Sequence, residues 1–238
     1  MPPLIRDGVS LLMGDFTQQE IDTVYRVIAA RRDMRHFRPD PLDEALVERL
    51  LGAAHLAPSV GLMQPWRFIR VRDRDLRSRV HALVEAERLE TARALGERED
   101  EFMRLKVEGI LECGELLVVA LMAGRDAHVF GRRTLPEMDL ASVACAIQNL
   151  WLASRAENIG MGWVSLFDPA ALRQLLRMPE GSRPVAVLCL GHVAAFYPRP
   201  MLEEVGWAHR FDLKSMVTTD YWSGSTDEAV PLPKNSFD

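Results

Sequence analysis

Apolar residues recur with the spacing of an amphipathic helix in several stretches of the chain. The first stretch begins at about Thr17, which can act as an N-cap with Glu20 completing a capping box, and it runs to a group of arginines. A second helix is predicted to open at Leu42-Asp43 and to end before Pro58, because the residue before a proline avoids helical geometry. A long helix is predicted at about residues 137–157, where apolar side chains cover nearly every side. We expect it at the centre of the fold or at a subunit interface.

Four apolar runs of strand length separate these helices. They are residues 66–71, 116–122, 161–167 and 184–193. The second run is apolar throughout, so we expect it to be buried on both faces of a sheet. Asn158 and Gly160 are expected to end the long helix, since both residue types tolerate positive φ. The irregular order of helices and strands favours an α+β fold with a central, mostly antiparallel sheet over a doubly wound one.

Residues 74–112 are rich in charge and are predicted to form helices that break near Gly96, with a second helical part at 102–110. Such a segment is a surface excursion or a lid over a site. The chain is predicted to form a single domain, 1–238, that carries this helical lid and an extended C-terminal arm at 211–238.

Composition narrows the function classes. The chain has 238 residues, 48% of them hydrophobic and 26% charged, as in an ordinary globular protein. Its net charge is −5 and no basic tail is present, so we do not expect a nucleic-acid partner. Three cysteines form no CxxC pair and six histidines form no HExxH motif, so a metal site is not expected either.

Membrane association is not expected from the sequence. The longest uncharged run, Leu140–Ser154, is shorter than the ~20 residues that a bilayer requires. The N-terminus lacks the basic and apolar regions of a signal peptide. We therefore expect a cytoplasmic protein.

Four arginines and one carboxylate, Asp33, occur within residues 31–38. If helical geometry persists there, Arg31 and Arg35 repel each other on adjacent turns, and a bound phosphate would remove that repulsion. Alternatively, the arginines only favour the negative end of the helix dipole and are solvated. The positive charge should lower the pKa of Asp33 and favour its carboxylate, unless desolvation opposes it strongly. A carboxylate here could transfer protons, or it could merely order the guanidiniums.

Two further stretches could face a ligand. The loop 57–66 carries two prolines and a glycine, and its amides and Gln64 could lie against a planar group, although an ordinary structured connection explains it equally well. In the strand 161–167, Ser165 follows Trp163 by two positions, so both side chains should share one face. A serine bonded to the backbone is the alternative. The sequence contains no GxGxxG after a strand, no Walker loop and no GxSxG elbow.

The order of these pieces resembles the nitroreductase-like flavoproteins, and within them the BluB family of 5,6-dimethylbenzimidazole synthases of cobalamin biosynthesis. The matching blocks are Arg31-Arg32-Asp33-x-Arg35, Ala57-Pro-Ser-Val-Gly-x-Met-Gln-Pro-Trp66, Leu105-Lys-x-Glu-Gly-Ile110, Gln148-Asn-Leu-Trp-Leu152, Gly162-Trp-Val-Ser165 and Pro200-x-Leu-Glu-x-x-Gly-Trp207. The general nitroreductase pattern has Ser in place of Asp33 and Asn in place of Leu62. Ala141 and Asn158 depart from the residues of this branch and put packing in doubt.

The resemblance implies a nitroreductase-like fold with FMN at a homodimer interface. Reduced FMN would be the substrate, broken down with molecular oxygen, and NAD(P)H would act through a separate flavin reductase. The catalytic pair would be Asp33 and Ser165. The implied flavin-binding residues are Arg31, Arg32, Asp33, Met34, Arg35, Ser59, Gln64, Leu105, Ser165 and Arg210, the last as an additional phosphate contact or a surface residue. Two alternatives stay open: an FMN-dependent NAD(P)H nitroreductase or dehalogenase that retains its flavin, and a flavin-binding or storage protein.

Overall fold

The computed structural model describes residues 14–222, which group into two compact units that divide at Tyr197. The prediction of a single domain over 1–238 stays a prediction. Of the predicted C-terminal arm, residues 223–238 lie outside the described part of the chain. Among the described residues, no helix is both long and apolar enough to cross a bilayer.

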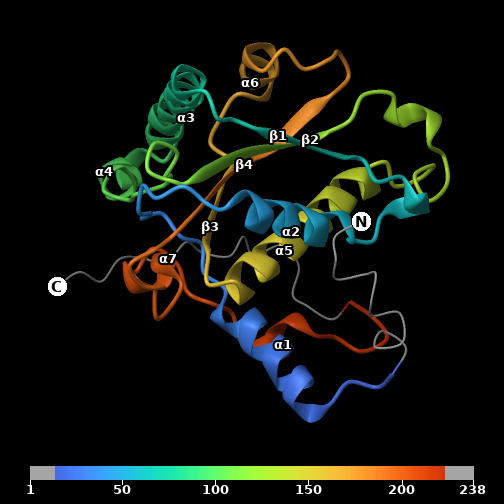
Figure 1. The fold of residues 1–238 in the computed structure, drawn as a ribbon. Helices are drawn as coiled ribbons and strands as arrows, with labels where there is room; N and C mark the ends of the chain where they lie inside the picture. The colour runs from blue at the N-terminus through green and yellow to red at the C-terminus, as the bar shows by residue number, and fades with distance from the viewer. Residues whose placement is uncertain (1–13, 223–238) are drawn as a thin grey trace. The chain divides into compact units, whose positions relative to one another are not determined.

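The first unit is built on an antiparallel sheet in the order β1-β2-β4-β3 (Figure 1). Its strands are β1 (Trp66–Arg70), β2 (Glu115–Leu121), β3 (Gly160–Val164) and β4 (Arg183–Gly191). Every residue of β2 is buried, which confirms the predicted burial of the apolar run 116–122 as far as Leu121. β2 pairs on one side with β1 and on the other with β4, so it is an inner strand of the sheet.

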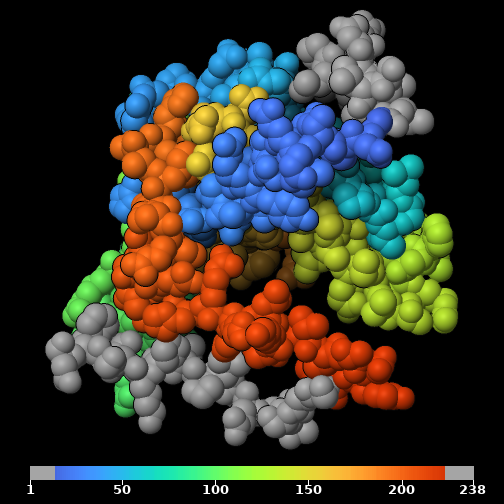
Figure 2. All heavy atoms as spheres, turned by 90° about the horizontal axis from the view of Figure 1, so that it is seen from below, coloured from blue at the N-terminus to red at the C-terminus, as the bar shows by residue number. Residues whose placement is uncertain are grey.

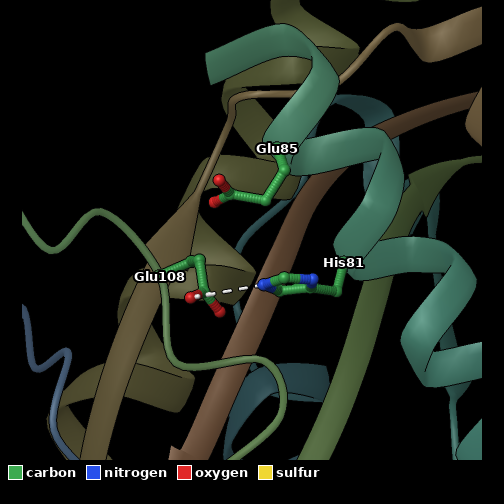
Figure 3. Close-up of side chains that lie close together, drawn as sticks. All are labelled: His81, Glu85 and Glu108. Atoms are coloured by element: carbon green, nitrogen blue, oxygen red, sulfur yellow. Dashed lines mark ion pairs between the residues drawn. The ribbon is translucent and has the colours of Figure 1, made fainter. Parts of the chain in front are cut away.

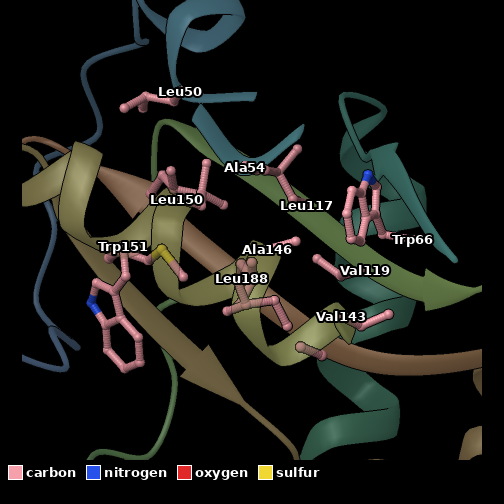
Figure 4. Close-up of a cluster of buried hydrophobic side chains, with 14 of the residues drawn as sticks. Leu50, Ala54, Trp66, Leu117, Val119, Val143, Ala146, Leu150, Trp151 and Leu188 are labelled. Atoms are coloured by element: carbon pink, nitrogen blue, oxygen red, sulfur yellow. The ribbon is translucent and has the colours of Figure 1, made fainter. Parts of the chain in front are cut away.

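Helices cover both faces of this sheet, as the α+β prediction requires (Figure 1). One face packs against α2 (Glu44–His55) and α5 (Met138–Ala156), and the other against α3 (Arg74–Ala94) and α6 (Pro169–Leu175). Alternate side chains of β2 pack into the cores on opposite faces of the sheet. Leu117 and Val119 belong to the first core (Figure 4), while Leu116 and Val118 belong to the second. The period of two along a strand thus divides one apolar run between two cores.

The helix α1 (Gln18–Ala30) begins at Thr17, and both hydrogen bonds of the predicted capping box are present. Its apolar side chains are not buried, however. Ile21, Val24, Tyr25 and Ile28 are between 37% and 68% exposed. In the space-filling view α1 (blue) lies across the outer surface of the face shown (Figure 2). This amphipathic helix therefore presents an open apolar stripe.

The charged segment breaks at Gly96, as predicted, because this residue has a φ of +57°. A 3-10 turn (Gly96–Arg98) and the short α4 (Glu99–Met103) follow α3. The expectation of a helix through residues 102–110 was wrong, since the helix ends at Met103. The reason is a competing donor: Nη2 of Arg88 binds the carbonyl oxygens of Met103 and Leu105 at 2.7 and 3.0 Å.

The first part of the predicted lid, α3, forms part of a core layer. Val80, Val84 and Ala92 of α3 are buried, the first two within the second core. Whether part of residues 74–112 closes over a ligand stays a prediction.

The long helix α5 ends near Asn158, which takes a φ of +58° as predicted. The same expectation for Gly160 was wrong, because this glycine is the first residue of β3. Its lack of a side chain serves packing instead: a Cβ there would lie 2.4 Å from Cγ1 of Val193. Asn158 alone therefore makes the left-handed turn.

The second unit contains the short helix α7 (Met201–Glu204) and a 3-10 turn (Leu213–Met216). Within this unit Nε of Arg210 pairs with Glu203 at 3.4 Å, and the Arg210 side chain is 74% exposed. Its predicted flavin contact stays a prediction.

Candidate active site

The chain leaves helical geometry at Arg31, whose ψ of 133° is extended. Asp33 then forms a parallel bridge with Met161 of β3, and the amide of Met34 donates to the carbonyl of Met161 at 2.9 Å. The idea that Arg31 and Arg35 lie on adjacent helical turns was therefore wrong. Residues 31–38 instead run as an extended segment, which we call the arginine segment, beside the glycine-rich strand.

Asp33 lies at the centre of the arginine segment and is held from two directions. Its Oδ1 accepts a hydrogen bond from the backbone N–H of Trp163 at 3.0 Å, and its Oδ2 pairs with Nη2 of Arg35 at 2.6 Å. The same Nη2 also donates to the carbonyl of Trp163 at 3.0 Å. These bonds fix the orientation of the carboxylate while 42% of its side-chain surface stays exposed.

The pKa of Asp33 is raised above its ordinary value, which corrects the expectation from charge alone. The largest cause is desolvation by the surrounding protein, and it outweighs the opposing effects of Arg35, the Trp163 amide and Arg31. The nearby positive charges therefore affect the pKa of Asp33 less than its desolvation does. A carboxyl group whose pKa lies closer to neutrality is a better proton donor and acceptor near neutral pH.

Arg31 and Arg32 are half-buried and contact α1 and α5. The guanidinium carbon of Arg31 lies 4.4 Å from the centre of the Trp151 ring. Nη1 of Arg32 donates to the carbonyl of Ala29 at 2.8 Å, near the C-terminus of α1. This contact agrees with the alternative in which the arginines lie at the negative end of a helix dipole, since the C-terminus of α1 is such an end. Phosphate binding by these residues stays a prediction.

Arg35 depends on a glycine in β3. Arg35 is 9% exposed, and a Cβ on Gly162 would lie 2.7 Å from Nη1 of Arg35 and 2.2 Å from the carbonyl oxygen of Met34. This confirms the prediction that the strand glycines permit close backbone approach. Met34 as a whole residue is 1% exposed, and its predicted flavin contact stays a prediction.

The loop before β1 is fixed by side-chain hydrogen bonds. Oγ of Ser59 accepts from the backbone N–H of Gln64 at 3.0 Å, and Gln64 adopts a φ of +48°. The amide of Val60 donates to Oγ of Ser142 in α5 at 3.0 Å. Gln64 also lines a cavity of about 530 Å³ together with His55 and Trp66. The two predicted flavin contacts of this loop, Ser59 and Gln64, are therefore joined by a hydrogen bond.

Ser165 lies beyond the end of β3, which stops at Val164. The argument that Ser165 and Trp163 share a strand face was therefore wrong, since the serine is exposed and its carbonyl accepts from the Phe167 amide at 3.2 Å. The catalytic role of Ser165 stays a prediction. Leu105 is partly buried in the irregular segment after α4, where its carbonyl accepts from Arg88.

The sequence reasoning missed Arg155. Its Nε donates to the carbonyl of Ala30 at 3.1 Å, its Nη1 donates to Oδ1 of Asn158, and its guanidinium carbon lies 4.0 Å from the Phe196 ring centre. Arg155 therefore ties the last turn of α5 to the C-terminal end of α1, directly before the arginine segment. One signal could have revealed it: Arg155 is the first charge after the uncharged run Leu140–Ser154.

The fold and this site define a member of the nitroreductase family, and the chain belongs to it, because the model of the "Nitroreductase family" matches residues 28–192. A solved structure of oxidized iodotyrosine deiodinase bound to FMN and 3-iodo-L-tyrosine shares the fold, with a TM-score of 0.61 and 23% sequence identity. The alignment covers 79% of this chain and 98% of that one.

Among curated relatives, the chain is similar to two 5,6-dimethylbenzimidazole synthases. It is 46% identical to the one from Rhodospirillum rubrum, over 76% of this chain and 86% of the relative. It is 42% identical to one from Rhodobacter capsulatus, over 81% of this chain and 94% of the relative.

Proposed function

We propose that this protein is a 5,6-dimethylbenzimidazole synthase, which uses molecular oxygen to fragment reduced FMN into 5,6-dimethylbenzimidazole and erythrose 4-phosphate. The similarity to two relatives of that name supports the assignment, since it extends over most of both chains. The nitroreductase fold, found with FMN bound in the deiodinase structure, supports a flavin as the ligand.

The observation that carries the proposal is the environment of Asp33. A flavin that is only reduced and reoxidised needs a hydride donor and then an electron acceptor, whereas cleavage of the ribityl chain from the ring needs repeated proton transfers. Asp33 is an oriented, partly exposed carboxyl group with a raised pKa, so it can accept and return protons. A serine, the usual residue of the wider family at this place, lacks that capacity.

The donor set of the arginine segment fits the phosphate of FMN. Guanidinium groups present planar, paired donors that suit phosphate oxygens. Arg31 and Arg32 are half-buried, which lowers the cost of ordering their side chains around an anion. Arg35 orients Asp33, and Ser59 with Gln64 supplies polar groups from the loop before β1. Ser165 would hold reacting groups by hydrogen bonding.

The proposal includes a homodimer and a transient flavin reductase. The open apolar stripe of α1 supports the dimer, because four large apolar side chains on one helix are costly to leave in water. A second copy of the chain would cover them. The reductase follows from the substrate, since reduced FMN must be supplied continuously if it is consumed.

The test is to mix the full chain with reduced FMN and oxygen, and to follow flavin absorbance together with products by mass spectrometry. Loss of flavin with equimolar appearance of 5,6-dimethylbenzimidazole is expected. Complete return of the flavin as oxidised FMN, with no benzimidazole, would overturn the proposal in favour of a flavin-retaining nitroreductase. Tight binding of FMN without reaction would instead indicate a storage protein.

A further inference from the structure

A group of metal-ligating side chains lies outside the candidate active site. Among the described residues, the ligand atoms of His81, Glu85 and Glu108 all lie within 4.8 Å of one another. His81 and Glu85 project from α3 toward Glu108, which lies on the irregular segment after α4 (Figure 3). No metal site was expected from the sequence.

We propose that His81, Glu85 and Glu108 bind one divalent transition-metal ion, Zn²⁺ in the first instance, as a structural clamp. Imidazole nitrogen and carboxylate oxygen are both ligands of Zn²⁺, and water would complete the coordination of these three groups. The two carboxylates supply negative charge, of which Arg88 beside Glu85 offsets part, and a divalent cation would offset the rest.

The distance between His81 and Glu108 fits coordination of a shared ion better than a hydrogen bond between the two side chains. Nε2 of His81 lies 3.7 Å from Oε1 of Glu108, which is too long for a hydrogen bond. Ligand atoms around a tetrahedral Zn²⁺, each about 2.0–2.1 Å from the ion, lie about 3.3 Å apart. The His81–Glu108 pair is close to that spacing at 3.7 Å, and the ligand atoms of the whole group, which lie within 4.8 Å of one another, would move closer on binding.

Both carboxylates already have partners that orient them. Oε2 of Glu108 accepts from the backbone N–H of Ile110 at 2.5 Å, which leaves Oε1 facing His81. Glu85 contacts Nη1 of Arg88 at 3.3 and 3.4 Å, distances long enough to shorten or break as the carboxylate turns. Such second partners are typical of metal ligands, because they fix the direction of the coordinating atom.

The backbone on each side of the group is anchored in the core. Val80 and Val84, the neighbours of His81 and Glu85 in the chain, are fully buried. Next to Glu108, Ile110 is fully buried, and a Cβ on Gly109 would lie 2.5 Å from the Phe37 ring. The ligand positions are thus built in advance, on a helix and on a segment that packs against the arginine segment.

A bound ion would join α3 to the segment that carries Leu105, one of the predicted flavin contacts. Irregular segments have few backbone hydrogen bonds of their own and open easily. A metal bridge from Glu108 to α3 would therefore hold residues 104–110 in place behind the arginine segment. The expected effect is structural, since no ligand of the group belongs to the proposed catalytic residues.

The test uses tag-free full-length protein stripped with EDTA and titrated with ZnCl₂ in competition with a chromophoric chelator. We expect one Zn²⁺ per chain with a Kd tighter than about 10 µM. Glu85→Gln and Glu108→Gln keep the side-chain shape and should each weaken binding at least about tenfold. His81→Ala should do the same, while His128→Ala, a change to an exposed histidine outside the group, should have no effect.

Two further readouts separate the clamp from unspecific binding. Zn²⁺ should slow hydrogen exchange at residues 104–110 in the wild type but not in Glu108→Gln. Co²⁺ in place of Zn²⁺ should give visible d–d absorption that His81→Ala removes. Unchanged Zn²⁺ affinity in both glutamine variants, or no binding by the wild type at 100-fold the expected Kd, would overturn the proposal. Because no flavin is present, these outcomes are independent of the proposed synthase activity.

Discussion

Two carboxylates of this protein, Asp33 and Glu108, sit in similar settings and have different partners. Both lie in extended or irregular backbone, and their segments touch where Gly109 packs against Phe37. Asp33 is paired with a guanidinium at 2.6 Å, whereas Glu108 faces an imidazole at 3.7 Å. A close arginine occupies the lone pairs of a carboxylate and fixes it, while a more distant imidazole leaves room for a cation. In the two proposals, the partner thus decides whether a carboxylate serves proton transfer or metal binding.

The largest effect is expected when the carboxylate of Asp33 is removed. Asp33→Asn should lower 5,6-dimethylbenzimidazole formation by about 10²- to 10⁴-fold, because an amide cannot carry protons. FMN affinity should stay unchanged, since the shape and the arginines remain. Product mass spectrometry and fluorescence titration measure the two quantities.

The corresponding substitution in the candidate metal site, Glu108→Gln, serves as a control for this prediction. Glu108→Gln should leave turnover by chelator-treated protein unaltered and reduce only Zn²⁺ binding, while Asp33→Asn should leave Zn²⁺ binding alone. Equal loss of turnover in both variants would contradict the separation of roles.

The next largest effect concerns the arginine segment as a phosphate site. Arg32→Ala should weaken FMN binding by about 10- to 100-fold, since a charge-assisted contact contributes roughly 1.5–3 kcal/mol. Riboflavin, which lacks the phosphate, is the control ligand and should bind the two proteins equally. If Arg32 only caps α1 through Ala29, FMN affinity will be the same in both and the assignment fails.

A smaller effect is expected when the close packing of the arginine segment against Gly162 is disturbed. Gly162→Ala places a Cβ 2.2 Å from the Met34 carbonyl and should lower the free energy of unfolding by about 1–3 kcal/mol. Gly14→Ala is the control: no atom lies within 4 Å of a Cβ there, so its effect should stay within about 0.5 kcal/mol. Urea unfolding measures both. An unaltered midpoint in Gly162→Ala would show that the arginine segment can move away from β3.

The smallest expected effect is on the pH dependence of turnover. If the carboxylate of Asp33 is the base, activity falls as pH drops and the group is protonated. Because its pKa is raised in the folded protein, this acid limb should lie above about 3.9, the ordinary value for aspartate. A pH profile of kcat checks this, and the limb should be absent from the residual activity of Asp33→Asn. A limb at or below the ordinary value would contradict the dominance of desolvation.

Several features of the fold could be read from the sequence because short-range chemistry fixes them. The capping box of Thr17 and Glu20, the buried run of β2 and the break at Gly96 depend on neighbours a few positions away. The same holds for the glycine at position 162, although which atoms it must admit was not visible. The helix expected through residues 102–110 does not form, because Arg88 of α3 binds the carbonyl oxygens that a continuing helix would have used.

The sequence by itself determined most of the elements that form, and it placed four arginines and one carboxylate within residues 31–38. Only the tertiary structure decided their chemistry. It turned the positive surroundings of Asp33 into a raised pKa, moved Ser165 beyond the end of β3, and brought Glu108 to His81. Periodicity and capping act through the local backbone, whereas desolvation and ligand geometry depend on which distant segments pack around a group, and a linear sequence does not state those distances.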